Sequence, residues 1–75
     1  MVGATNIMKL KGKIVENGMT MEDLADALKM DYSTLYRKMK SDGLSFSIKE
    51  ANDIVNVLKL TGDEAMNIFF SNLVA

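Results

Sequence analysis

The chain has 75 residues, a net charge of −1 and a composition that is 48% hydrophobic, so it is long enough for one domain with a small core. It contains neither Cys nor His. Their absence excludes disulfides, thiolate or imidazole metal sites, and every catalytic centre that depends on a Cys nucleophile or a His base. We therefore expect a protein that is not an enzyme and that uses no metal, cofactor or small-molecule ligand.

Charge is unevenly distributed along the chain. The first 40 residues carry seven basic and five acidic side chains, whereas residues 41–75 carry two basic and five acidic ones. The positive charge is thus concentrated in the first half. No apolar stretch has the length of a membrane span and the N-terminus lacks the pattern of a signal peptide, so we expect a cytoplasmic protein without membrane contact.

The first predicted helix covers residues 7–16 and ends at Asn17-Gly18, because Gly readily adopts the left-handed conformation that follows a helix. Its expected apolar stripe consists of Ile7, Leu10 and Ile14, with Met8 and Val15 as further members. Gly12 costs about 1 kcal/mol relative to Ala inside a helix, so we expect close packing of a neighbouring helix there, with chance occurrence as the alternative. We interpret Lys9, Lys11 and Lys13 as a solvated face, with a second DNA contact as the alternative.

Two short helices come next. Thr20 is predicted to cap the first of them, because its hydroxyl can accept hydrogen bonds from amides of the first turn. Residues 29–31 break the pattern, and Asp31 is expected to cap a third helix over residues 32–40. The residues expected to face the core are Leu24, Ala25, Leu28, Leu35 and Met39.

Two capping boxes mark the last two helices. In residues 47–50 (SIKE) and 61–64 (TGDE), a hydroxyl and a carboxylate three residues apart satisfy each other's backbone amides. The fourth helix follows Ser47, and the fifth runs to residue 72 or 73. Their expected core faces are Ile48, Ala51, Ile54, Val55 and Leu58 in the fourth, and Ala65, Ile68, Phe69 and Leu73 in the fifth. The seven Met residues are expected to fill irregular gaps in the core.

These five segments contain no alternating strand pattern, so the predicted fold class is all-α, with five short helices. We expect a single domain over residues 1–75, in which residues 1–6 are flexible. Its second and third helices have the spacing of a helix-turn-helix unit over residues 20–40, and Ala25 is small enough to let them cross closely. This arrangement leaves on the solvent face of the third helix Tyr32, Ser33, Tyr36, Arg37 and Lys40, which suit the major groove of DNA.

Residues 20–28 (TMEDLADAL) and 33–39 (STLYRKM) resemble the small phage Cro and lambda-repressor-like helix-turn-helix regulators. Shorter matches at residues 10–14 (LKGKI), 46–47 (FS), 50–51 (EA) and 68–70 (IFF) extend the resemblance to residues 7–73. It implies a lambda-repressor-like domain that binds DNA sequence-specifically. It also implies a transcriptional regulator that acts as a homodimer on a near-palindromic operator in double-stranded DNA.

In such regulators the third helix enters the major groove. The resemblance assigns base contacts to Tyr32, Ser33, Tyr36 and Arg37. Arg37 is the strongest candidate, because its planar guanidinium can pair bidentately with O6 and N7 of guanine. Tyr32 fits either a thymine methyl or a phosphate, and Tyr36 fits either a base contact or the edge of the core. The candidate phosphate contacts are Thr20, Lys29, Lys38 and Lys40.

Two positions depart from the family pattern. Lys29 lies in the turn between the second and third helices, where the family usually has Gly. The turn must therefore hold a non-Gly residue in a strained conformation or follow a different path. Met21 stands where the family commonly has a Gln that clamps a phosphate. We expect both changes to affect DNA affinity more than the fold.

The fifth predicted helix has a second apolar stripe, formed by Met66, Phe70 and Val74. A short helix that is apolar over most of its circumference is buried on more than one side. We interpret this stripe as a dimer interface, with a folded-back C-terminal tail as the alternative.

A rival hypothesis is a protein-interaction module, antirepressor-like or antitoxin-like, that keeps the fold but binds DNA weakly or not at all. The slightly acidic balance, Met21 and Lys29 favour it. The charge of the face that bears Tyr32, Ser33 and Arg37 discriminates between the two hypotheses, because DNA binding needs that face to be positive.

Overall fold

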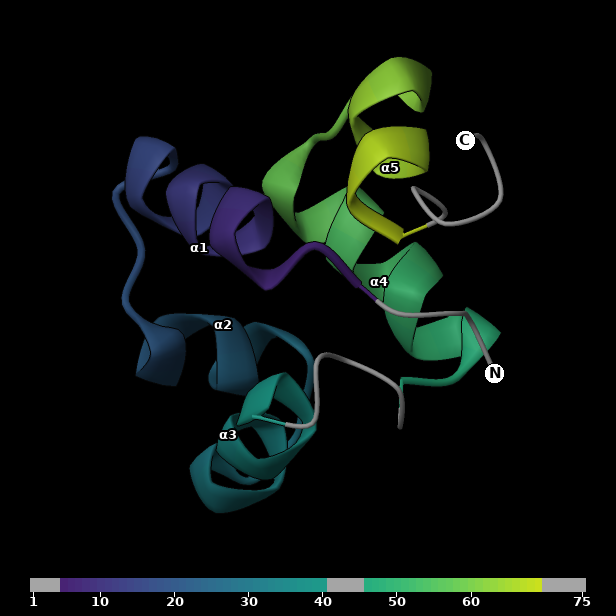
Figure 1. Ribbon diagram of the computed structural model, residues 1–75. Helices are drawn as coiled ribbons and strands as arrows, with labels where there is room; N and C mark the ends of the chain where they lie inside the picture. The colour runs from purple at the N-terminus through teal and green to yellow at the C-terminus, as the bar shows by residue number, and fades with distance from the viewer. Residues whose placement is uncertain (1–4, 41–45, 70–75) are drawn as a thin grey trace.

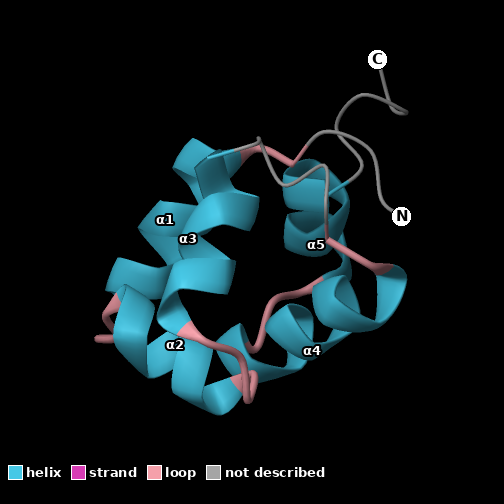
Figure 2. Ribbon diagram, turned by 90° about the horizontal axis from the view of Figure 1, so that it is seen from below, coloured by secondary structure: helices cyan, strands magenta, loops and turns pink. Residues whose placement is uncertain are grey.

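The computed structural model describes residues 5–40 and 46–69, and within these ranges the chain forms five α-helices and no strand (Figures 1 and 2). The helices are α1 (Ile7–Glu16), α2 (Met21–Ala27), α3 (Tyr32–Lys40), α4 (Ile48–Leu58) and α5 (Gly62–Phe69). The predicted all-α class is confirmed. The predicted continuation of the fifth helix to residue 72 or 73 lies outside the described residues. None of the five helices is long and apolar enough to cross a membrane.

Reciprocal capping boxes fix the start of three helices. These boxes pair Thr20 with Asp23, Ser47 with Glu50, and Thr61 with Glu64. At the start of α4, the Ser47 hydroxyl accepts from the Glu50 amide at 3.0 Å, and the Glu50 carboxylate accepts from the Ser47 amide at 2.8 Å. The helix starts therefore follow from local sequence, as predicted.

Three helices end with the same backbone motif. At the end of α2, the Lys29 amide donates to the Asp26 carbonyl at 3.1 Å and the Met30 amide donates to the Ala25 carbonyl at 2.9 Å. This motif requires a left-handed residue after the helix, which Gly adopts most readily. Gly18 provides it after α1, but Lys29 and Lys59 provide it after α2 and α4, with φ of 56° and 54°. The turn between α2 and α3 thus holds a strained non-Gly residue, the first of the two paths considered above.

The chain just before α1 is attached to α5. The Asn6 amide donates to the Ile68 carbonyl at 2.7 Å, and the Asn6 side chain caps α1 by accepting from the Lys9 amide. Thr5 is buried. The hydrogen bond to Ile68 joins Asn6 to α5, and the predicted flexibility of residues 1–6 stays a prediction. Residues 1–4 lie outside the described residues.

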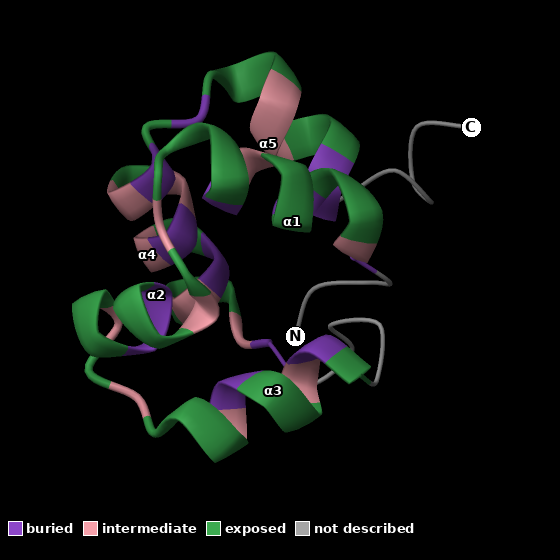
Figure 3. Ribbon diagram, turned by 90° about the vertical axis from the view of Figure 1, so that its left-hand side faces the viewer, coloured by how far each residue is buried: buried purple, intermediate pink, exposed green. Residues whose placement is uncertain are grey.

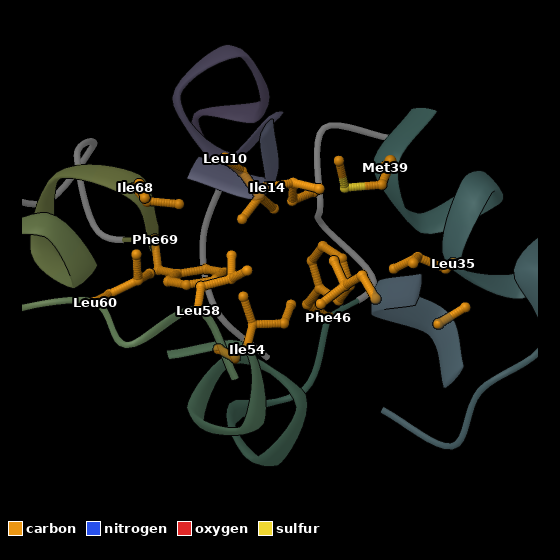
Figure 4. Close-up of a cluster of buried hydrophobic side chains, with 13 residues drawn as sticks. Leu10, Ile14, Leu35, Met39, Phe46, Ile54, Leu58, Leu60, Ile68 and Phe69 are labelled. Carbon is orange, nitrogen blue, oxygen red and sulfur yellow. The ribbon is translucent and has the colours of Figure 1, made fainter. Parts of the chain in front are cut away.

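One apolar core joins all five helices (Figure 4). Phe46, which precedes α4, is fully buried and lies between Leu35 and Met39 on one side and Ile54 on the other. The other members are Leu10, Ile14, Leu24, Ala25, Ala51, Leu58, Leu60, Ile68 and Phe69. Phe46 and Leu60 lie outside the helices, so helical periodicity did not predict their burial. They fill the space that short helices leave between them.

Several residues predicted to be buried lie on the surface. Met8, Val15 and Ile48 are 85%, 73% and 68% exposed. At about 100° per residue, Met8 and Val15 lie on the side of α1 opposite Leu10. The expectation that every Met fills the core is therefore wrong for Met8 and also for Met66, which is 47% exposed. Close helix packing at Gly12 is also wrong, because a Cβ placed there would meet nothing within 4 Å.

Candidate nucleic-acid interface

The α3 helix lies at one edge of the molecule, with its buried side turned toward the other helices (Figure 3). Leu35 and Met39 are buried and anchor this side, and α3 packs against α2. At about 100° per residue, Ser33 and Arg37 lie on the opposite side of the helix, and both are exposed. The structure thus directs two predicted base-contacting residues outward.

Tyr32, Tyr36 and Lys40 form a second ridge along α3, beside Ser33 and Arg37. The two phenol rings are stacked, with centroids 6.0 Å apart and planes 22° apart. Lys40 Nζ lies 5.4 Å from the centroid of the Tyr36 ring, a cation–π distance. Because Tyr32 and Tyr36 are 47% and 46% exposed, this ridge belongs to the surface rather than to the core. We call these three residues the tyrosine ridge.

Lys38 occupies the other flank of α3 and faces α4. Its Nζ donates to both carboxylate oxygens of Glu50 at 2.7 Å, and the two side chains are only 21% and 24% exposed. Partial burial alone would raise the pKa of the Glu50 carboxyl, but the hydrogen bonds from Lys38 and Ser47 together lower it below its ordinary value. Lys38, a predicted phosphate contact, is thus paired with a carboxylate of the protein itself.

The remaining predicted phosphate contacts are dispersed. The Thr20 hydroxyl accepts from the Asp23 amide at 3.1 Å in the cap of α2. Lys29 is exposed in the turn before α3 and lines a hollow of about 490 Å³ between α2 and α4, together with Lys49 and Asp53. Neither residue lies on the tyrosine ridge or beside Arg37 on the outward side of α3. The predicted phosphate contacts therefore lie at the start of α2, in the α2–α3 turn and along α3, and do not form one cluster.

Lys11, interpreted from the sequence as part of a solvated face, lies close to the tyrosine ridge. It lines a hollow of about 270 Å³ between α1, α2 and α3, which it shares with Tyr36 and Lys40. No sequence pattern in α1 distinguishes Lys11 from Lys9. The two lysines differ only in the helices beside which they lie once α1 has packed. From the sequence, a DNA contact by Lys11 is only the alternative to a solvated face, and it is shared with Lys9 and Lys13. The structure singles out Lys11 as the one that lies beside Tyr36 and Lys40.

Lys13 lies on a different side of α1 and joins it to α5. Its ammonium donates to Glu64 and to Glu16, the latter at 3.3 Å. The Glu64 hydrogen bond outweighs partial desolvation and raises the pKa of Lys13, while the same contact with Lys13 lowers the pKa of Glu64. This lysine therefore serves the packing of α1 against α5.

The predicted dimer stripe falls partly within the described residues. Met66 is 47% exposed on α5, whereas the neighbouring Ile68 and Phe69 are buried. Phe70 and Val74, the other two members of the predicted stripe, lie outside the described residues. Met66 is thus the only described member, and it is on the surface.

Comparisons with protein-family models, curated proteins and solved structures found no match. The candidate interface therefore rests on the geometry of its own side chains. Its central element, α3, carries three basic residues and no acidic one.

Proposed function

We propose that the protein is a sequence-specific DNA-binding transcriptional regulator of the phage Cro or repressor kind. In this proposal, α2 and α3 form a helix-turn-helix unit in a lambda-repressor-like domain, and α3 enters the major groove of an operator. The supporting observation is the outward side of α3, where Ser33 and Arg37 are exposed next to the tyrosine ridge. A helix that presents donors and planar groups on one exposed side fits the width of the major groove.

In this proposal the two tyrosines of the tyrosine ridge make different contacts with DNA. Tyr36 stacks with Tyr32 and has Lys40 Nζ near its ring, so its hydroxyl is the group that we assign to DNA contact. Tyr32 begins the helix and has one ring face outside the stack, which suits apolar contact with a thymine methyl. Arg37 pairs with O6 and N7 of a guanine.

Electrostatic attraction to DNA is modest in this proposal. The net charge is −1, and Glu50 neutralises Lys38. Among the predicted phosphate contacts, Lys29 and Lys40 remain as exposed basic side chains. Discrimination between sequences therefore depends on a few contacts from α3, and a homodimer doubles them by placing two copies of α3 about 34 Å apart on one face of the duplex.

Selection of bound sequences from a random duplex library tests this function directly. We expect enrichment of a near-palindromic site with a guanine in each half-site. Arg37→Ala should weaken binding to that site by about 1 to 3 kcal/mol and relax the preference at one base pair per half-site. Arg37→Lys is the matched control, since it keeps the charge but loses the bidentate fork. If Arg37→Ala enriches the same sequences as the wild type, Arg37 does not contact the guanine.

The alternative function is a protein-interaction module, and the pairing of Lys38 with Glu50 favours it because it takes positive charge from α3. Tyr and Arg are enriched among residues that dominate protein–protein binding energy, so the same exposed side of α3 would then bind another protein. A library selection that enriches no sequence would overturn the DNA-binding proposal and leave this alternative.

A further inference from the structure

The hollow between α1, α2 and α3 has an unusual set of lining residues. It measures about 270 Å³ and is lined by Lys11, Met21, Tyr36, Met39 and Lys40. Two lysines and one tyrosine are therefore among its lining residues, and none of these lining residues is acidic. We call it the Lys11–Lys40 hollow.

Two other hollows in the described part of the molecule differ in charge. The one between α1 and α5 contains Lys13 together with its partners Glu16 and Glu64. The one between α2 and α4 contains Lys49, whose Nζ lies 3.0 Å from Asp53. In each of these hollows a carboxylate neutralises one lysine, and a second lysine, Lys9 in the first and Lys29 in the second, also lines the wall.

Lys11 and Lys40 form no ion pair with any residue in the ranges 5–40 and 46–69. Lys40 contacts the Tyr36 ring, which attracts the ammonium without neutralising its charge. The Lys11–Lys40 hollow therefore combines two positive charges with no compensating negative charge among the described residues.

The walls of the hollow strengthen its attraction for an anion. Met39 is buried and Met21 packs against the core, so apolar groups border the two lysines. Electrostatic attraction is stronger beside apolar walls than in bulk water, because the effective dielectric constant is lower there. A compact oxyanion that accepts from both ammonium groups and from the Tyr36 hydroxyl matches these donors.

We propose that the Lys11–Lys40 hollow binds a backbone phosphate of double-stranded DNA, with Lys11 of α1 as a contact outside the α2–α3 unit. This inference rests on the proposed DNA-binding function. Tyr36 and Lys40 belong both to the hollow and to the tyrosine ridge. A strand that borders the groove occupied by α3 therefore passes the hollow, and the phosphate fixes the depth of α3 without reading sequence.

Paired substitutions on α1 test this site. Lys11→Ala and Lys9→Ala remove the same charge from exposed positions of the same helix, but Lys9 lines the α1–α5 hollow instead. We expect Lys11→Ala to weaken binding to the selected operator and to an unrelated duplex by the same factor. It should also reduce the slope of log affinity against log salt by about 0.9. Lys9→Ala should leave this slope unchanged, and equal effects of the two substitutions would overturn the site.

A second experiment acts on the DNA. Single neutral methylphosphonate linkages are placed in turn along the operator backbone, and affinities are measured for the wild type and Lys11→Ala. We expect one position per half-site at which the neutral linkage weakens the wild type but not Lys11→Ala. If the two proteins respond alike at every position, Lys11 contacts no phosphate and the inference is wrong.

A third measurement separates this inference from the proposed function. Inorganic phosphate is titrated into the protein while the methyl signals of Met21 and Met39 are followed by NMR. We expect phosphate to shift both signals in the wild type and in Lys9→Ala but not in Lys11→Ala. If the protein shows these shifts but binds no duplex, the hollow is an anion site and its assignment to DNA is wrong. No shift in the wild type, together with an unchanged salt slope in Lys11→Ala, would overturn the site itself.

Discussion

Lys38 Nζ lies 2.7 Å from both carboxylate oxygens of Glu50, so one ion pair joins α3 to α4. The same carboxylate accepts from the Ser47 amide at 2.8 Å and completes the cap of α4. Glu50 thus fixes both the start of one helix and the flank of the helix beside it. Because the two side chains are mostly shielded from solvent, water screens this ion pair less than an exposed one.

This pairing predicts a specific loss of stability at acid pH. The folded state holds the pKa of Glu50 below its ordinary value, so the unfolded chain binds more protons as the pH falls below about 5. The contribution of the pair is therefore complete at neutral pH and is lost as the pH falls through the lowered pKa.

Glu50→Gln keeps a capping side chain but removes the charge. We expect it to cost about 1 kcal/mol at pH 7 and to reduce the difference in stability between pH 7 and pH 3, measured by urea unfolding. Lys38→Met, which retains an apolar stem, should reduce the same difference. An unaltered pH dependence in Lys38→Met would show that the ion pair is not its source.

Lys29 predicts a gain in stability from a glycine. Its φ of 56° is left-handed, a conformation that costs a non-Gly residue about 1 to 2 kcal/mol. Gly removes this strain but adds about 0.5 to 1 kcal/mol of unfolded-state entropy, so Lys29→Gly should raise the free energy of unfolding by up to about 1 kcal/mol.

Lys29→Ala separates the backbone effect from the charge, because it removes the ammonium and keeps the strain. Thermal unfolding should therefore rank Lys29→Gly above the wild type and Lys29→Ala no higher than it. If Lys29 contacts phosphate, both variants should weaken DNA binding equally. A stabilised Lys29→Ala would contradict backbone strain as the cause.

Phe46 is the most consequential core residue outside the helices. Phe-to-Ala substitutions in a core cost about 3 to 5 kcal/mol, which is a large share of the stability of a 75-residue domain. We expect Phe46→Ala to lose the cooperative thermal transition seen by circular dichroism. Ile48→Ala, two residues later and on the surface, should change stability by no more than about 0.5 kcal/mol.

Met66 tests the predicted dimer interface within the described residues. Met66→Asp places a charge in the proposed apolar contact, so sedimentation should give a monomer at concentrations where the wild type is a dimer. Met8→Asp is the matched control, because it introduces the same charge at an exposed position on α1. If Met8→Asp is a monomer while Met66→Asp remains a dimer, the interface lies on α1 and not on α5.

Local interactions made much of the fold predictable. The capping boxes at Thr20, Ser47 and Thr61 involve residues three apart, so their sequence spacing is enough to predict the helix starts. The same holds for the sides of α3, where helical geometry alone separates buried Leu35 from exposed Arg37. It fails for Phe46, because a residue outside a helix has no periodicity to reveal its burial.

The sequence by itself determined the five helices, the all-α class and the outward position of Arg37, because these depend on residues within a few positions of one another. Only the tertiary structure decided which lysines retain an uncompensated charge. Lys38 and Lys13 meet carboxylates 12 and 51 residues away, whereas Lys11 and Lys40, from different helices, border one hollow. Such pairings arise when helices pack, because packing brings together charges that are distant in the chain.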